Sequence, residues 1–156
     1  QSDAAALYSS KATEFYGDWL ELAIDGSGDH YKMEYDLDDT FSLKYNILFQ
    51  YVLELGGPFE NSVIEMESAY YQDNLNTYGV PLDNRADFTK LDWSMWVAAM
   101  GTDDQFNAIT STTWAFADST TDRVPLSDWT YTSNPTMAGF QARPVMGGIY
   151  AKLLMP

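Results

Sequence analysis

The sequence contains no cysteine, a single histidine and few basic residues. The absence of cysteine excludes disulfides, a cysteine nucleophile and thiolate-bound metals. His30 alone cannot form a centre with several histidine ligands, and we expect neither a metal ion nor a cofactor. Eight Lys and Arg residues stand against 23 Asp and Glu residues, which gives a formal charge of -15. Such a chain repels phosphates, so nucleic acid is not an expected partner.

Long apolar runs are also absent. No run approaches the ~20 apolar residues that a membrane-spanning helix needs, so we expect no membrane partner. The chain starts with Gln1-Ser2-Asp3, which lacks the basic start and apolar stretch of a signal peptide, and we expect a mature or cleaved terminus. The acidic, cysteine-free and aromatic-rich composition is typical of secreted microbial proteins, which predicts an extracellular location.

The sequence does contain enough apolar material for a packed core. A length of 156 residues suits a single domain. Hydrophobic residues make up 46% of the chain and aromatic residues 15%. Intrinsic disorder requires low hydrophobicity together with high charge, and this composition excludes it.

Apolar residues recur at spacings of three and four along much of the chain, which predicts helices. In the first of these, Tyr8, Ala12, Phe15 and Trp19 share one face. Glycine and proline clusters such as Gly56-Gly57-Pro58 mark helix ends. The predicted helices span approximately residues 4–24, 42–55, 60–75, 89–101, 103–117 and 139–154.

These helices alternate between amphipathic and almost wholly apolar ones, and the apolar ones are expected to be buried on more than one side. The apolar helices begin near residues 42, 89 and 139, at intervals of 47 and 50, which indicates a repeated helical hairpin. Extended segments precede the last two of them, because proline disfavours a helix at the preceding residue. These segments are Val80-Pro81-Leu82-Asp83 and Val124-Pro125-Leu126-Ser127-Asp128.

A repeat of outer helix, extended segment and inner helix predicts an all-α fold, the α/α toroid, whose closed ring has six hairpins. This chain supplies about three. Half a ring would expose its inner helices as a large apolar patch, which a soluble monomer rarely tolerates. We therefore expect another polypeptide to complete the ring or the chain to be a piece of a longer protein; a small open array is the third alternative.

Several segments, taken together and in order, resemble the C-terminal region of the glutaminase A family, which comprises secreted fungal and bacterial proteins. The segments that carry the resemblance are Gly28-Asp29-His30-Tyr31, Lys44-Tyr45-Asn46, Tyr78-Gly79-Val80-Pro81-Leu82-Asp83-Asn84-Arg85, Thr89-Lys90-Leu91-Asp92-Trp93-Ser94-Met95-Trp96, Arg123-Val124-Pro125-Leu126-Ser127-Asp128-Trp129 and Gly139-Phe140-Gln141-Ala142-Arg143-Pro144-Val145-Met146-Gly147-Gly148.

The resemblance implies that residues 1–156 are the C-terminal half of a six-hairpin domain. Family members are several times longer and carry N-terminal β-rich domains. The implied activity is hydrolysis of glutamine to glutamate and ammonia, with the rest of the parent enzyme present as a second chain. An acidic motif in the first half of the family's helical domain has no match in this chain.

In α/α toroids the active-site funnel is lined by loops and by the N-terminal ends of the inner helices, and polar residues of this chain fall there. Amide hydrolysis needs proton transfer and a grip on the substrate's charged groups. We predict Asp92 and Asp128 as catalytic residues. The predicted substrate-binding residues are Arg85 and Arg143 for the carboxylate, with Asp83, Gln141 and Trp129.

Each of these residues also has a structural interpretation. Asp92 would stabilise the helix dipole from the first turn, and Asp128 would cap a turn. Either arginine would serve in a structural ion pair, and Gln141 would bind backbone. His30 is expected in a loop or at the surface, and Gly147 and Gly148 are expected to permit close helix packing.

Two other functions remain open at this stage. A glycoside-processing toroid would also use a pair of carboxylates, with Trp93 and Trp129 against sugar rings. A half-ring without catalytic activity would act as a binding module.

Overall fold

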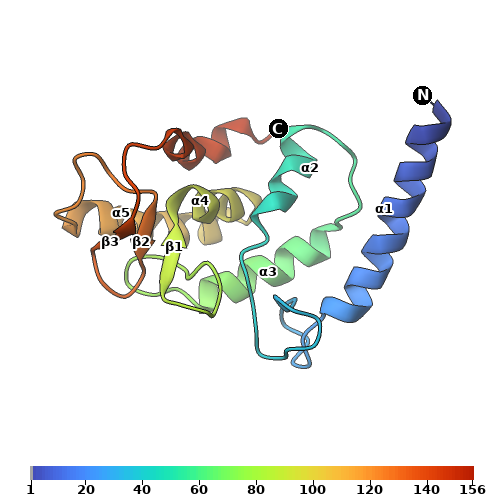
Figure 1. Cartoon of the computed structure of the whole chain (residues 1–156), viewed down its shortest axis with the longest axis horizontal. Coiled ribbons are helices and arrows are strands. Elements are labelled where there is room, and N and C mark those ends of the chain that lie inside the picture. The colour runs from blue at the N-terminus through green and yellow to red at the C-terminus, as the bar shows by residue number, and fades with distance from the viewer. Residues whose placement is uncertain (1) are drawn as a thin grey trace.

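The computed structural model describes residues 2–156. The chain is rich in helix and carries one small sheet (Figure 1). Its elements in order are α1 (Ser2–Ala23), the 3₁₀ helix η1 (Tyr45–Ile47), α2 (Leu48–Val52), α3 (Asn61–Asp73), β1 (Phe88–Lys90), α4 (Leu91–Met100), α5 (Asp103–Ser119), β2 (Trp129–Tyr131), β3 (Met137–Gly139) and the 3₁₀ helix η2 (Pro144–Leu154).

Helix α4 is the most deeply buried helix and packs against both η2 and α5. Its sequence is apolar nearly all round, as a helix covered on several sides requires. Small residues on α4 allow these neighbours to approach: Ala98 packs in the core shared with α3 and α5, and Ala99 packs against α2 and η2. The burial predicted for the apolar helix near residue 89 is confirmed.

Helix α5 begins where the sequence supplies a capping box. The hydroxyl of Thr102 accepts a hydrogen bond from the backbone N–H of Gln105, and the Gln105 side chain accepts one from the backbone N–H of Thr102. This reciprocal pair satisfies two backbone donors that the helix itself leaves unpaired. Helix α4 has no such side-chain cap: Thr89, the first residue of the predicted helix 89–101, lies in β1, and the helix starts at Leu91.

The all-α prediction missed the sheet. Strands β1, β2 and β3 are antiparallel neighbours in that order, with Thr89 opposite Thr130 and Trp129 opposite Gly139. Each strand has three residues, too short for an alternating pattern to stand out in the sequence. Extended segments before the inner helices were predicted, and β1 and β2 follow them closely.

Two predicted inner helices are shorter than their apolar patterns suggested. Near residue 42 the backbone is held in an extended bridge, because Leu43 N–H donates to Leu82 C=O at 2.8 Å, and helix begins only at Tyr45. The last helix was predicted from Gly139, which instead belongs to β3. It begins at Pro144 as a 3₁₀ helix, after an extended Arg143 that the proline ring favours.

Apolar side chains remain exposed on the inner segments and on α1. Around α2 they include Phe49, Leu53 and Leu55, and on η2 they include Tyr150 and Leu153. No helix among the described residues is long and apolar enough to cross a membrane.

Among the described residues, helix α1 packs against the rest of the chain through its C-terminal part. Trp19 and Tyr16 pack against Phe59, whereas Tyr8 and Phe15 on the same apolar face are 73% and 63% exposed. In Figure 1 the N-terminal half of α1 accordingly projects away from the other helices. The predicted amphipathic face therefore has a partner along only part of its length.

Gly148 is a point of close approach between η2 and α4. A Cβ atom on Gly148 would lie 2.6 Å from Trp96 Nε1 and 2.7 Å from Asp92 Cβ, whereas a Cβ on Gly147 would meet nothing within 4 Å. The expected role in close packing is thus confirmed for Gly148.

We expect Gly148→Ala to lower the free energy of unfolding by about 1–3 kcal/mol, because the methyl group overpacks the interface. The matched control, Gly147→Ala, introduces the same methyl group one residue away into open space and is expected to be neutral or slightly stabilising. Urea denaturation of both variants measures the difference. Equal effects of the two substitutions would contradict the packing argument.

Candidate functional site

The predicted site residues lie in two groups near the start of α4, with Gln141 apart from both. The first group, Asp83 and Arg85, lines a cavity of about 610 Å³. The start of η1 contributes Lys44 and Tyr45 to the same cavity, and α4 contributes Trp93. Tyr45 and Trp93 stack with ring centroids 4.0 Å apart and form one apolar wall.

Asp83 holds Arg85 in a two-pronged contact. Arg85 donates from Nε to Asp83 Oδ1 at 3.0 Å and from Nη2 to Oδ2 at 2.6 Å, and its backbone N–H donates to Oδ1 at 2.9 Å. Asp83 is buried while the Arg85 side chain is 68% exposed. Burial by itself would raise the pKa of Asp83, but the hydrogen bonds and charge of Arg85 outweigh it and lower that pKa. The carboxylate therefore fixes a cation at the cavity edge.

Behind the cavity lies a buried polar network that the sequence analysis did not identify. Glu67 of α3 accepts hydrogen bonds from the backbone N–H of Tyr31 and from the Tyr71 hydroxyl, and its Oε2 lies 3.5 Å from Lys44 Nζ. Burial lowers the pKa of Lys44 and raises that of Tyr71 well above its ordinary value. One feature of the sequence could have revealed this network: the carboxylate of Glu67 lies on the apolar face of α3, between Ile64 and Tyr71.

The second group joins Asp92, Asp128, Arg143 and Trp129 around Lys90. Asp128 Oδ2 lies 3.1 Å from Lys90 Nζ and 3.2 Å from Arg143 Nη1. Both aspartates are buried, and within residues 2–156 their Oδ1 atoms have no hydrogen-bond partner. Burial raises the pKa of Asp92, and the charge of Asp128 adds to this effect. Two carboxyl groups thus occupy different electrostatic environments.

Aromatic rings surround the Lys90 ammonium. Its Nζ lies 4.8 Å from the ring centroid of Trp129 and 4.7 Å from that of Phe140. Arg143 Cζ lies 4.7 Å from the same Phe140 ring. A cation against the face of an aromatic ring is stabilised by the ring quadrupole, which keeps both cations close to Asp128.

Gln141 is not part of either group. Its side-chain Nε2 donates to the carbonyl oxygen of Pro125 at 2.9 Å, as in the structural interpretation of this residue. The contact ties the segment before Arg143 to the loop before Asp128.

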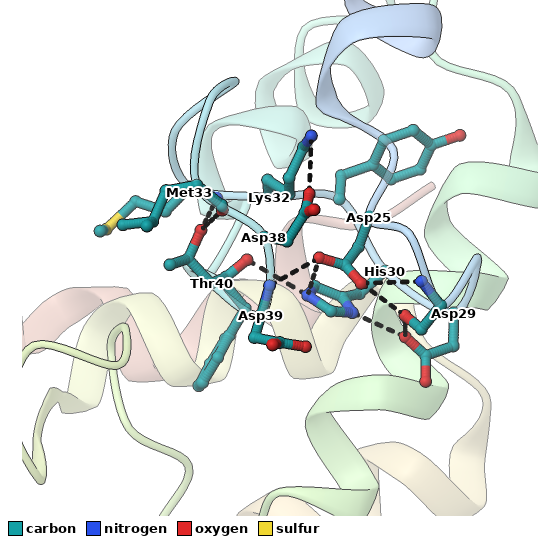
Figure 2. Close-up of polar contacts among 12 residues, drawn as sticks. Asp25, Asp29, His30, Lys32, Met33, Asp38, Asp39 and Thr40 are labelled. Carbon is teal, nitrogen blue, oxygen red and sulfur yellow. Dashed lines mark hydrogen bonds and ion pairs between the residues drawn. The ribbon is translucent and has the colours of Figure 1, made fainter.

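His30 was expected in a loop or at the surface, and the structure places it in a loop but buries it. Its ring stacks on Tyr70 with centroids 4.0 Å apart and is 3% exposed. Nδ1 lies 2.6 Å from Asp29 Oδ1 and Nε2 lies 3.2 Å from the Thr40 carbonyl oxygen. Both contacts are drawn as dashed lines in Figure 2. The burial of His30 results from its contact with Tyr70 of α3, which the sequence around His30 does not reveal.

Asp25, Asp29 and His30 each place one potential metal-ligand atom within 4.8 Å of the others. Both imidazole nitrogens, however, already lie against protein oxygen atoms, Oδ1 of Asp29 and the Thr40 carbonyl oxygen. Asp25 accepts hydrogen bonds from the Ser27 backbone and hydroxyl and from the Asp39 N–H (Figure 2). The cluster therefore ties the end of α1 to the loop at residues 37–40.

The chain is thus a helical-hairpin domain in which buried carboxylates and the cations that face them gather at the start of its central helix. It belongs to the glutaminase A family, because the model of the glutaminase A six helical-hairpin domain matches residues 1–153.

Two curated fungal proteins are similar to this chain. Glutaminase A of Aspergillus oryzae is 32% identical over 98% of the chain and 23% of its own length. A probable glutaminase of Arthroderma benhamiae is 23% identical over 99% of the chain and 21% of its own length. The chain therefore spans less than a quarter of either relative. No solved structure matches it.

The Asp25 cluster generates a prediction about acid stability. Hydrogen bonds from Ser27, chiefly from its backbone, lower the pKa of Asp25 from 3.8 to about 2. A carboxyl group whose pKa is lower in the folded state stabilises the fold at pH values above its ordinary pKa. This contribution is lost as the pH falls through the folded-state pKa of about 2. We expect Asp25→Asn to cost about 1–3 kcal/mol at neutral pH, with the difference from wild type shrinking between pH 4 and pH 2.

Denaturant unfolding at several pH values measures this effect. Asp38→Asn is the matched control, because Asp38 is an exposed carboxylate of the same loop that pairs, within the described part of the chain, only with Lys32. A difference between Asp25→Asn and wild type that stayed constant down to pH 2 would exclude the proposed linkage.

Proposed function

We propose that this chain is part of a secreted glutaminase that hydrolyses the side-chain amide of L-glutamine to glutamate and ammonia. Membership of the glutaminase A family and the names of both relatives support the substrate class. The catalytic proposal rests on the buried residues Asp92 and Asp128. In the described part of the chain, each has one carboxyl oxygen, Oδ1, without a hydrogen-bond partner. The other oxygen of Asp128 lies against two cations, Lys90 and Arg143.

The pair suits a division of acid and base roles. When two carboxyl groups have different environments, the group with the raised pKa donates a proton and the other accepts one. Asp128, which faces two cations, takes the proton of the attacking water as the C–O bond forms. Asp92 donates its proton to the nitrogen as the C–N bond breaks and ammonia leaves.

The remaining predicted residues would bind or position the substrate. Arg85 and Arg143 are the candidate partners of its carboxylate, and Asp83 orients Arg85. Trp129 forms a wall beside Lys90, and Gln141 holds the segment that carries Arg143. Gly148 of η2 packs directly on Asp92, whereas Arg143 beside Asp128 has a side chain that is 38% exposed.

We expect Asp92→Asn and Asp128→Asn each to lower kcat for glutamine about 10²–10⁴-fold, the usual contribution of a general acid or base. Ammonia release by the complete protein is the measurement, with circular dichroism as the test of folding. The control is Asp104→Asn, the same change at an exposed position in the first turn of α5.

The outcomes separate the alternatives. Full activity in both variants would remove Asp92 and Asp128 from the mechanism. Release of reducing sugar from a glycoside, abolished by the same substitutions, would favour the glycoside-processing alternative, which the aromatic cavity wall of Tyr45 and Trp93 also suits.

We further propose that residues 1–156 form the C-terminal half of an α/α toroid whose other half lies in the same parent protein. The exposed apolar side chains of α2 and η2, and the quarter-length coverage of the relatives, support this proposal. The missing hairpins would cover these side chains and complete the substrate funnel.

The native mass tests this arrangement. We expect the native particle to exceed the 17.6 kDa of this chain and to contain the other hairpins, in the same polypeptide or a second one. Mass measurement under native and denaturing conditions decides the matter. A stable, active particle of this chain alone would contradict the half-ring proposal.

A further inference from the structure

The cavity beside η1 carries one acidic and one basic side chain that retain free hydrogen-bonding capacity. Glu34 and Arg85 both line it, on segments that lie about fifty residues apart in the sequence. We propose that this cavity binds the head group of a free α-amino acid, with Arg85 on the α-carboxylate and Glu34 on the α-ammonium. The identity of that amino acid as glutamine rests on the function proposed above.

Arg85 has the geometry of a prepared carboxylate receptor. A guanidinium presents two edges that each match a carboxylate. Asp83 occupies the edge formed by Nε and Nη2. Among the described residues no acceptor bonds to Nη1, so the edge formed by Nη1 and Nη2 is available to a second carboxylate. Because Asp83 is buried and fixed, Arg85 is held in place before the ligand binds.

Lys44 lines the same cavity but its donors are already used. Its Nζ donates to the carbonyl oxygens of Tyr31 at 2.7 Å and Ser42 at 3.0 Å, and it faces Glu67 at 3.5 Å. An ammonium has three donor hydrogens, and these acceptors account for all of them. Arg85 is therefore the cation of this cavity with hydrogens to offer.

Glu34 supplies the complementary charge. It is exposed, and in the described part of the chain it makes no ion pair within 4.0 Å, including with Arg85. Its charge nevertheless reaches Arg85, whose pKa is raised chiefly by Asp83 and further by Glu34. The two side chains are thus neighbours that leave space between them, as the opposite charges of an amino acid require.

The aromatic walls suit the aliphatic side chain that an amino acid carries beyond its head group. Trp93, stacked on Tyr45, and Trp19, stacked on Tyr31 with centroids 4.2 Å apart, present apolar faces to the cavity. Such faces accept the methylenes of an aliphatic side chain. The volume of about 610 Å³ lies within the roughly 300–1,000 Å³ of small-molecule sites.

Calorimetric titration of the complete protein with L-glutamate, which carries the head group but no amide to hydrolyse, tests the proposal. We expect Arg85→Lys and Glu34→Gln each to raise the Kd about tenfold or more, because each weakens a charge-assisted contact. Arg123→Lys and Glu21→Gln make the same changes at exposed positions outside the cavity and should leave the Kd unchanged. Thermal melting checks that all four variants fold.

N-acetyl-L-glutamate separates the two contacts. It lacks the ammonium, so it should bind wild type weakly, and Glu34→Gln should weaken it no further. A loss of affinity on Glu34→Gln that is equal for both ligands would overturn the role of Glu34. Unchanged L-glutamate affinity in both cavity variants would overturn the whole proposal.

The same variants distinguish this inference from the proposed function. Glutamine hydrolysis with a KM unaffected by Arg85→Lys and Glu34→Gln would refute the amino-acid cavity while leaving the glutaminase proposal intact. Binding of L-glutamate that depends on both residues, without hydrolysis of glutamine, would support the cavity and refute the activity.

Discussion

Gly148 brings the backbone of η2 against the side chains of Asp92 and Trp96, and the arrangement around α4 depends on this contact. With η2 on one side and α5 on the other, α4 is removed from water along most of its length. Burial of an apolar helix provides much of the driving force for folding a domain of this kind. The same contact buries Asp92, so the packing that stabilises the fold also creates the environment that raises the pKa of this carboxyl group.

This acidic chain has eight basic residues, and half of them pair with its buried carboxylates. Four of the eight basic residues face buried carboxylates: Lys44 faces Glu67, Arg85 faces Asp83, and Lys90 and Arg143 face Asp128. A buried carboxylate without a partner would be costly. Three of these cations, Lys44, Lys90 and Arg143, directly precede η1, α4 and η2 in the sequence.

The two groups of site residues divide the proposed work between them. The cavity at η1 offers an open space with a held arginine and an exposed glutamate, which suits recognition. The Asp92 and Asp128 group is buried and has unequal carboxyl environments, which suits proton transfer. Under the proposed function, each group would supply one face of a site in the complete protein, because the chain spans less than a quarter of its relatives.

Periodicity and ordered motifs determined the order of most helices, the burial of α4 and the likeness to the glutaminase A family, because these depend on residue spacing along the chain. The burial predicted for the apolar helices near residues 42 and 139 was wrong for much of their length, since Phe49, Leu53, Tyr150 and Leu153 are exposed. The sequence also marked Asp92, Asp128, Arg85 and Arg143, since ordered motifs contain them. Only the tertiary structure decided which of these residues meet, that β1 to β3 form a sheet, and that His30 and Glu67 are buried. Those features depend on contacts between residues far apart in sequence, such as Glu67 with Tyr31 and Asp128 with Lys90, and no local pattern records such contacts.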